Sequence, residues 1–269
     1  MNPLARARNG AGGGEESQRA LAVMDVLQLR DFYATPLGHA ARHLIAHRLR
    51  QCARPPADAR VMGLGFAAPW LDAYRRRCRD VFSFMPARQG IIHWPARGHS
   101  ASALVDETAL PLTDSAIDMA LVVHGLELAE NLNAMLAEVW RVLAPQGHLV
   151  VVVPNRRGMW ARRDTTPFGH GRPFSRGQLE RLLTEAGFEL VNVMPALFMP
   201  PVQRRLFLHS AMMWERAGLA LWQGFSGLIV AEAVKRVHAL RGRRARRFAI
   251  PDLAPLPSPS PALNGLRKG

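Results

Sequence analysis

Regular alternation between short apolar runs and amphipathic segments is the feature that most restricts how this chain can fold. It extends from about residue 60 to residue 234, and two of the apolar runs, 118–123 and 148–153, contain hardly any polar residues. Continuous apolar strands are typical of parallel strands that helices cover on both faces. The alternation therefore predicts an α/β fold with a doubly wound, mostly parallel sheet and right-handed crossovers.

Local signals mark where several helices begin. Thr35 before Pro36 is an N-cap followed by proline at the first helical position, and it opens a helix to about residue 50. Ser175 and Gln178 have the spacing of a capping box, and the helix that they open should end before Gly187. We also predict helices over residues 21–32 and 202–222 from their apolar spacing.

Composition divides the chain into four parts. The ends lack a periodic apolar pattern, and the last stretch is first basic (RGRRARR) and then rich in proline and serine, so both ends should be disordered. The expected parts are a disordered segment 1–20, N-terminal helices 21–53, an α/β domain 54–240 and a disordered tail 241–269.

The charge balance leaves two explanations open. The formal net charge is +14, and almost the whole excess comes from arginine. Such a balance favours anionic partners, including nucleic acid. The arginines are nevertheless dispersed along the chain and form no single stripe, which is equally compatible with an ordinary solvated surface.

Cysteine usage and hydropathy bear on the compartment. The two cysteines, Cys52 and Cys78, form no CxxC motif, which is typical of a reducing compartment and argues against structural zinc. The N-terminal residues lack the apolar core of a secretory signal, and no apolar run is long enough to span a bilayer. We expect a cytoplasmic protein without a metal site or a membrane span.

The loop 155–174 is the least ordinary stretch of the chain. It follows a predicted central strand, and ligands of open α/β sheets bind outside the carboxyl ends of the strands. Arg156, Arg157 and Arg172 could bind a carboxylate or phosphate, and Trp160 could stack on a planar group. These residues are candidates for binding a substrate, with a solvated basic loop as the alternative.

A family resemblance is carried by residues 110–155, LPLTDSAIDMALVVHGLELAENLNAMLAEVWRVLAPQGHLVVVVPN. This segment resembles the second half of the class I S-adenosylmethionine-dependent methyltransferases of the type-11 group. The resemblance covers roughly residues 60–235 and implies a seven-stranded sheet, N-terminal helices that cover the cofactor, and S-adenosyl-L-methionine as that cofactor. In the motif itself, Glu138 and Arg141 could simply anchor a helix on the sheet, and Asp118 could close a turn.

The resemblance also indicates where the cofactor should bind. The glycine-rich turn after the first strand corresponds to Gly63, Gly65 and Ala67, the ribose position at the end of the second strand to Met85, and the adenine position to Asp106. The pattern departs from the family at two acids, because Gly63 and Met85 stand where carboxylates are usual. Loss of the ribose carboxylate removes charge-assisted hydrogen bonds worth about 1.5–3 kcal/mol each.

Three functions follow from these observations. The leading one is a methyltransferase that acts on a small or acidic acceptor, with His124 at the end of the fourth strand as a candidate base; His124 could instead cap the strand. The second is a catalytically degenerate fold that serves as a binding or regulatory module. The third is a protein that binds or modifies nucleic acid. The sequence does not define the oligomeric state.

Overall fold

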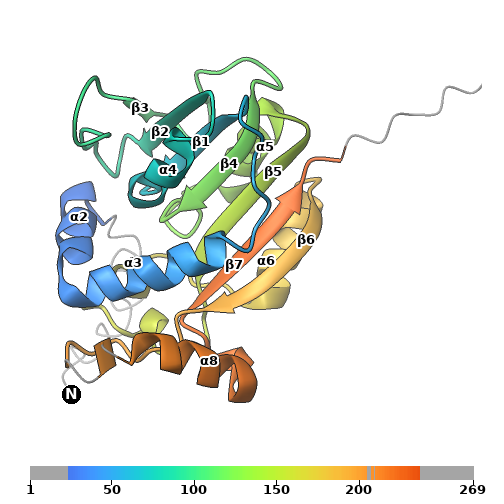
Figure 1. Cartoon of the computed structure of the whole chain (residues 1–269). Coiled ribbons are helices and arrows are strands. Elements are labelled where there is room, and N and C mark those ends of the chain that lie inside the picture. Colours follow the sequence, from blue (N-terminus) through green and yellow to red (C-terminus); the bar gives the residue numbers. More distant parts are fainter. Residues whose placement is uncertain (1–23, 205–206, 209, 237–269) are drawn as a thin grey trace, which may run out of the picture. The chain divides into compact units, whose positions relative to one another are not determined.

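The computed structural model describes residues 24–204, 207–208 and 210–236, and these contain a seven-stranded sheet (Figure 1). The strand order is β3-β2-β1-β4-β5-β7-β6. The first five strands along the chain run parallel, and β7 runs antiparallel to both of its neighbours. The strands are β1 Arg60–Gly65, β2 Asp80–Pro86, β3 Ser102–Val105, β4 Ile117–Val123, β5 Leu143–Pro154, β6 Glu189–Ala196 and β7 Leu228–Val234. The predicted doubly wound, mostly parallel sheet is confirmed.

Helices cover both faces of this sheet. One apolar core joins the sheet to α2, α3 and α4, with residues of α8 packed at its margin, and a second core joins the other face to α5 and α6. The helices are α2 Val26–Ala34, α3 Pro36–Leu49, α4 Ala68–Arg75, α5 Leu132–Val142, α6 Arg176–Glu185 and α8 Ala211–Leu221. Three short 3-10 turns, Trp160–Arg162, Pro167–Gly169 and Gln223–Phe225, lie in the connections. None of the described helices is long and apolar enough to cross a membrane.

The predicted helix starts agree with the structure. The Thr35 hydroxyl accepts a hydrogen bond from Gly38 N, and α3 begins at Pro36. Ser175 and Gln178 form the reciprocal capping box at the start of α6. The prediction over residues 202–222 was wrong at its beginning, because residues 202–204 are irregular after two prolines and α8 begins only at Ala211. The disordered ends expected at 1–20 and 241–269 lie outside the described residues.

A buried ion pair joins α3 to α8. Arg48 on α3 donates to the Glu215 carboxylate on α8 at 3.1 Å, and both side chains are buried. The same carboxylate accepts hydrogen bonds from the backbone amides of Leu197 and Phe198, which follow β6. Because both charges are paired and hydrogen-bonded, the cost of burying them is offset.

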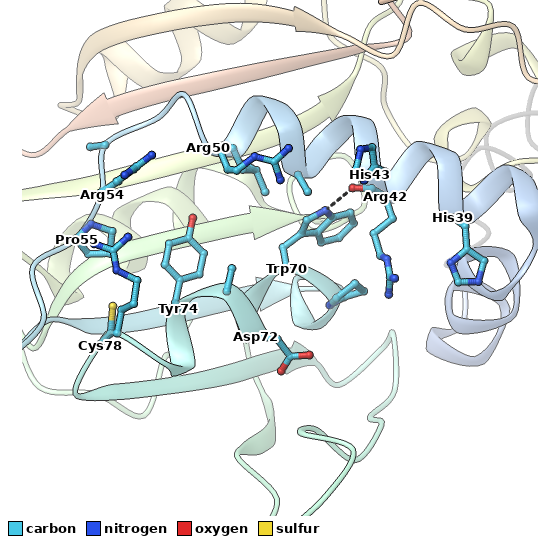
Figure 2. Close-up of a pocket in the computed structure, with 16 residues that line it drawn as sticks. His39, Arg42, His43, Arg50, Arg54, Pro55, Trp70, Asp72, Tyr74 and Cys78 are labelled. Carbon is cyan, nitrogen blue, oxygen red and sulfur yellow. Dashed lines mark hydrogen bonds between the residues drawn. The ribbon is translucent and has the colours of Figure 1, made fainter. Parts of the chain in front are cut away.

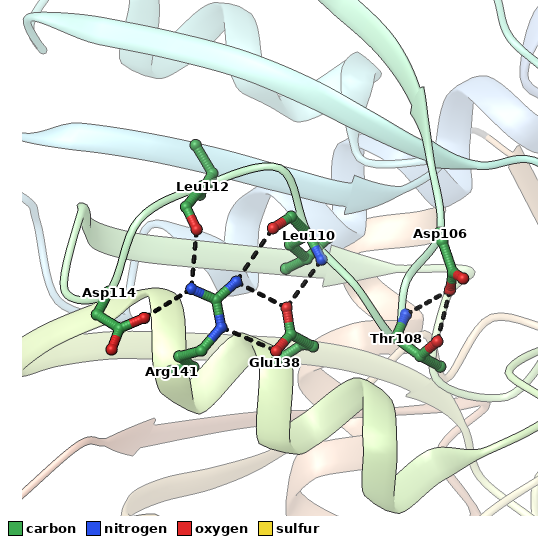
Figure 3. A network of polar contacts seen from close by, with 7 residues as sticks. All are labelled: Asp106, Thr108, Leu110, Leu112, Asp114, Glu138 and Arg141. Atoms are coloured by element: carbon green, nitrogen blue, oxygen red, sulfur yellow. Dashed lines mark hydrogen bonds and ion pairs between the residues drawn. The ribbon is translucent and has the colours of Figure 1, made fainter.

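A second polar cluster clamps the turn before β4 onto α5 (Figure 3). The Arg141 guanidinium donates to the Glu138 carboxylate at 2.8 Å, to Asp114 at 2.7 Å and to the carbonyls of Leu110 and Leu112. Glu138 in turn accepts the amide of Leu110 at 2.8 Å. The anchoring role considered for Glu138 and Arg141 is therefore the one that they have.

Other polar side chains close the sheet at its amino end. The Asp118 carboxylate accepts the backbone amide of Arg60 at 2.8 Å, which joins the starts of β4 and β1. Asp118 thus ties two neighbouring strands together instead of closing a turn as predicted, at the edge of the sheet opposite to the strand ends where ligands bind in such folds.

The clamp gives a test of stability. Arg141→Gln should lower the free energy of unfolding by about 2 kcal/mol, because Glu138 and two carbonyls lose a charged donor. For a domain of this size the melting temperature should fall by about 4–8 °C. The control is Arg181→Gln on α6, whose guanidinium donates to a carbonyl of its own helix and is exposed.

The same pair predicts a pH dependence. The hydrogen bond from Arg141 lowers the pKa of Glu138. A lowered folded-state pKa stabilises the fold above the unfolded value of about 4.3 and loses that effect as the pH falls through the folded value. The melting difference between parent and Arg141→Gln should be full at pH 7 and shrink below about pH 4. An unchanged difference at pH 3 would contradict the ion pair as its cause.

Candidate functional site

The carboxyl ends of β1, β2 and β4 lie side by side, because β1 pairs with both of the other strands. The strand order reverses between β1 and β4, so the connections of these two strands leave for opposite faces. Open α/β sheets bind ligands at such a switch point. The structure brings most of the predicted cofactor residues to this edge of the sheet.

The turn from β1 into α4 requires glycine at one position. Gly65 has φ +81°, and a Cβ there would lie 2.4 Å from the carbonyl oxygen of Val123. The next amide, Phe66 N, donates to that carbonyl at 2.7 Å, so the turn is held directly on the end of β4. Gly65 thus gives the close backbone approach that the resemblance implies.

The packing of α4 against β1 leaves no room for a side chain at Gly63. A Cβ at this position would lie 2.6 Å from Leu71 Cδ1 and 2.9 Å from the Cβ of Ala67. The room that a carboxylate would need is filled by α4. Ala67 is itself fully buried at the start of that helix. The missing acid at Gly63 and the close seat of α4 on β1 therefore go together.

Met85, at the ribose position, is part of the apolar core. Its side chain is 0% exposed, and its Sδ accepts the backbone amide of Ile92 at 3.4 Å. Asp106, after β3, is by contrast exposed. Its Oδ1 accepts the hydroxyl and the amide of Thr108 (Figure 3), and these hydrogen bonds lower the pKa of Asp106. Asp106 is ionised at neutral pH and caps its own loop.

His124 stands in the middle of a buried hydrogen-bonded chain. The Tyr33 hydroxyl lies 2.8 Å from His124 Nε2, and His124 Nδ1 lies 3.1 Å from Glu127 Oε1. Burial, with a smaller effect of Glu127, raises the pKa of Tyr33 well above its usual value. The phenol is therefore neutral and can donate to Nε2, which leaves the Nδ1 proton for the Glu127 carboxylate.

Aromatic rings pack α2 against this series of hydrogen bonds. Tyr33 stacks on Phe66 with ring centroids 5.6 Å apart and meets Trp70 edge-on at 5.3 Å. From the other side, Phe168 lies 4.8 Å from the His124 ring. These contacts join α2, the turn after β1, the end of β4 and the basic loop into one packed unit. In the described structure, Tyr33 of α2 stacks on Phe66, the residue that follows Gly65, and both are buried.

Two acceptor atoms beside His124 are left unpaired. The Gln89 side chain donates through Nε2 to the backbone carbonyl of His124 at 2.8 Å, and the Gln89 backbone carbonyl accepts Val26 N of α2 at 2.7 Å. Within the part of the chain that the structure describes, the buried atoms Gln89 Oε1 and Glu127 Oε2 have no hydrogen-bond partner. A buried acceptor without a partner costs about 1–3 kcal/mol, so native structures keep few of them.

The residues predicted in the basic loop do not converge. Arg156 is exposed and donates to the carbonyl of Pro173, and Arg172 is exposed with its amide bonded to the Glu127 carbonyl. Arg157 lines a separate hollow of about 380 Å³ beside α6. Trp160 is only 1% exposed, and its indole donates to the carbonyl of Met199 at 2.7 Å. Its ring is therefore packed in the core and presents no open face for stacking.

Sequence reasoning did not identify Tyr33, Glu127 or Gln89. Tyr33 follows Val26 and Leu29 at helical spacing, which marks it as a core position but not as the partner of a histidine 91 residues later. Glu127 stands three residues after His124, a spacing that could have suggested the pair. Gln89 carries no local signal. The basic RGRRARR segment lies outside the described residues, and among the described ones no group of three or more His, Cys, Asp or Glu side chains could hold a metal ion.

Comparison with known proteins agrees with this architecture. A curated protein of Mycolicibacterium smegmatis named "Probable S-adenosylmethionine-dependent methyltransferase" is 34% identical over 87 residues, which are 32% of this chain and 34% of the relative. The match thus spans about a third of that relative's length. A methyltransferase structure from Thermotoga maritima has a TM-score of 0.57 at 17% identity and covers 78% of this chain and 96% of its own.

A second structure, a methyltransferase from Archaeoglobus fulgidus, has a TM-score of 0.52 at 16% identity, with 72% of this chain and 94% of the other covered. These two likenesses establish the fold. The family is established by sequence, because the family described as "Methyltransferase domain" matches residues 37–193, more than half of the chain. The chain belongs to this methyltransferase-domain family.

Proposed function

We propose that this protein is an S-adenosylmethionine-dependent methyltransferase whose cofactor crevice lies at the carboxyl ends of β1, β2 and β4 and is covered by α2. Family membership and the switch-point geometry support the location. The observation that carries the proposal is the pair of unpaired buried acceptors, Gln89 Oε1 and Glu127 Oε2, beside a turn that only glycine can make.

The residues present fit the cofactor in its polar demands. Ribose hydroxyls and an ammonium group are donors, and Gln89 Oε1 and Glu127 Oε2 are acceptors that lack one. Gly65 permits a close approach of the ligand to the backbone. Asp106 at the end of β3 is ionised and exposed, and it remains our candidate for the adenine amino group.

The fit requires α2 to move. Tyr33 of α2 stacks on Phe66, the residue after Gly65, and Met85 belongs to the same apolar core as α2. A ligand that binds only the open form has its affinity reduced by the fraction of molecules that are open. Together with the missing ribose carboxylate, this cover predicts weaker cofactor binding than in a family member that has the complete motif.

The chemistry assigned to this chain's own residues is modest. When bound, the cofactor supplies a methyl group activated by a positively charged sulfur. Displacement of Tyr33 would free His124 Nε2, which could then take the proton that the acceptor loses as its bond to the methyl carbon forms. Glu127, 3.1 Å from Nδ1, would hold the ring and stabilise the resulting imidazolium. Methyl transfer otherwise depends mainly on positioning.

We propose a small acceptor that carries a carboxylate or phosphate. Three exposed arginines belong to the loop that follows β5, the strand that pairs with β4 of the proposed crevice. They are Arg156, Arg157 and Arg172. Guanidinium groups suit both kinds of anion. Trp160 is left out of this proposal, because its indole is committed to the Met199 carbonyl.

One observation favours a second function, a methyltransferase fold that serves as a binding module. Met85 is 0% exposed, so the position of the ribose carboxylate is filled by core. A module of this kind would keep α2 closed and would not bind the cofactor. The two functions differ in a single titration.

The test is a calorimetric titration of S-adenosylhomocysteine into the parent and into Met85→Asp. Without ligand, the variant should melt about 6–12 °C lower, because a carboxylate then lies in an apolar core at a cost of about 3 kcal/mol. In the open form the same carboxylate would accept the ribose hydroxyls. The affinity of Met85→Asp for S-adenosylhomocysteine should therefore exceed the affinity of the parent by about tenfold.

The control is Met85→Leu, which conserves volume and should cost less than about 1.5 kcal/mol without any gain in affinity. Lower stability of Met85→Asp with no binding by either protein would reject the enzyme and favour the module.

The acceptor assignment is tested by replacing Arg156, Arg157 and Arg172 together with Gln. Transfer of labelled methyl groups from S-adenosylmethionine to a panel of small carboxylates and phosphate esters should be lost, since the anion loses its charged donors. Affinity for S-adenosylhomocysteine should stay within about twofold, because these side chains are not part of the crevice.

A matched control replaces three exposed arginines elsewhere, Arg79, Arg97 and Arg181, and should retain transfer. If the loop variant lost S-adenosylhomocysteine affinity while keeping acceptor use, the loop would belong to the cofactor site.

A further inference from the structure

A large pocket lies between α3 and α4 (Figure 2), and of its lining residues only Trp70 also belongs to the aromatic cluster at the strand-end site. Its volume is about 720 Å³, within the range of sites that hold small organic ligands. Residues of α3 form one wall, α4 and the residues after it form the other, and the segment 53–55 closes one end. We call it the α3–α4 pocket.

Four arginines line the α3–α4 pocket against a single carboxylate. Arg42 and Arg50 come from α3 and its C-cap, Arg54 from the following segment and Arg77 from beyond α4, while the acid is Asp72. All four arginines are exposed, and within residues 24–204, 207–208 and 210–236 none of them pairs with a carboxylate. Free guanidinium groups gathered around one cavity favour a ligand with more than one negative charge.

The remaining walls are apolar and aromatic. Tyr74 of α4 lines the pocket together with Pro55 and Pro69, while Trp70, which also lines it, is only 4% exposed. The Trp70 indole donates to the carbonyl of Arg42 at 3.1 Å, which fixes α4 against α3 (Figure 2). A planar apolar group could lie against these walls while the guanidinium groups hold an anion.

Two titratable side chains of the pocket, Tyr74 and Cys78, are neutral donors. Burial raises the pKa of Tyr74 to about 12, so its phenol stays protonated and can donate a hydrogen bond. Burial also raises the pKa of Cys78, which keeps this thiol protonated at neutral pH. A neutral thiol is a poor nucleophile, so the pocket is arranged for binding.

We propose that the α3–α4 pocket binds a small molecule that joins a planar ring to two or more phosphate charges, as a nucleoside diphosphate does. The volume accommodates a ligand of this size, the arginines match the phosphates, and the aromatic and proline walls match the ring. This site is separate from the proposed cofactor crevice and does not depend on methyl transfer.

The test uses ADP, GDP and pyrophosphate in calorimetric titrations of the full chain. At least one nucleoside diphosphate should bind, tenfold or more tightly than pyrophosphate, because the ring contributes apolar contact. Arg42→Gln with Arg77→Gln should weaken that binding at least tenfold. No binding by either nucleotide at millimolar concentration, or equal affinity for pyrophosphate, would overturn the proposal.

The matched control changes the charge by the same amount on the opposite face of the sheet. Arg176→Gln with Arg181→Gln, on α6, should alter nucleotide affinity less than twofold. Equal losses in the two pairs would reduce the effect to net charge and reject the pocket.

Competition separates this site from the cofactor crevice. Saturating S-adenosylhomocysteine should leave nucleotide affinity unchanged, whether or not the protein binds S-adenosylhomocysteine. Displacement would assign the nucleotide to the crevice and contradict the proposal. A short single-stranded RNA that bound far more tightly than any nucleotide, and lost its affinity in the Arg42 and Arg77 double variant, would also overturn the assignment to a small molecule.

Discussion

The hydrogen bond between the Tyr33 hydroxyl and His124 Nε2 is the contact on which the state of the candidate site depends. It joins the first described helix to the end of β4 at 2.8 Å, inside a cluster where Tyr33 stacks on Phe66. Burial of the aromatic rings, which supply most of the apolar area, adds to the stabilisation that this hydrogen bond gives. While this hydrogen bond is intact, α2 covers the switch point of the sheet, and His124 and Glu127 beneath it remain buried.

The covering helix α2 lies before the matched family segment. The family match begins at residue 37, whereas α2 ends at Ala34. Two hydrogen bonds connect α2 to different strand ends. Val26 N donates to the Gln89 backbone carbonyl after β2, and the Tyr33 hydroxyl bonds to His124 at the end of β4. A protein that lost its ribose carboxylate and gained this packing would bind cofactor weakly and in competition with its own helix.

Much of the fold could be predicted, because the signals that define it are local. The continuous apolar runs of β4 and β5 predict buried parallel strands, and the Thr35-Pro36 and Ser175-Gln178 signals identify helix starts. The site is less predictable, because its contacts join residues distant in sequence. Trp160 looked like a stacking platform in a basic loop, yet its indole reaches Met199 and it belongs to the core. Burial of Met85, like the partner of His124, depends on tertiary packing that no local pattern specifies.

Competition between the cofactor and α2 for the same edge of the sheet can be measured by amide hydrogen exchange with and without saturating S-adenosylhomocysteine. Exchange in residues 26–34 should speed up about tenfold or more on binding, which corresponds to about 1.4 kcal/mol of lost protection. Exchange in α5, residues 132–142, should stay unchanged or slow down. Binding that leaves α2 as protected as before, or no binding at all, would contradict the account.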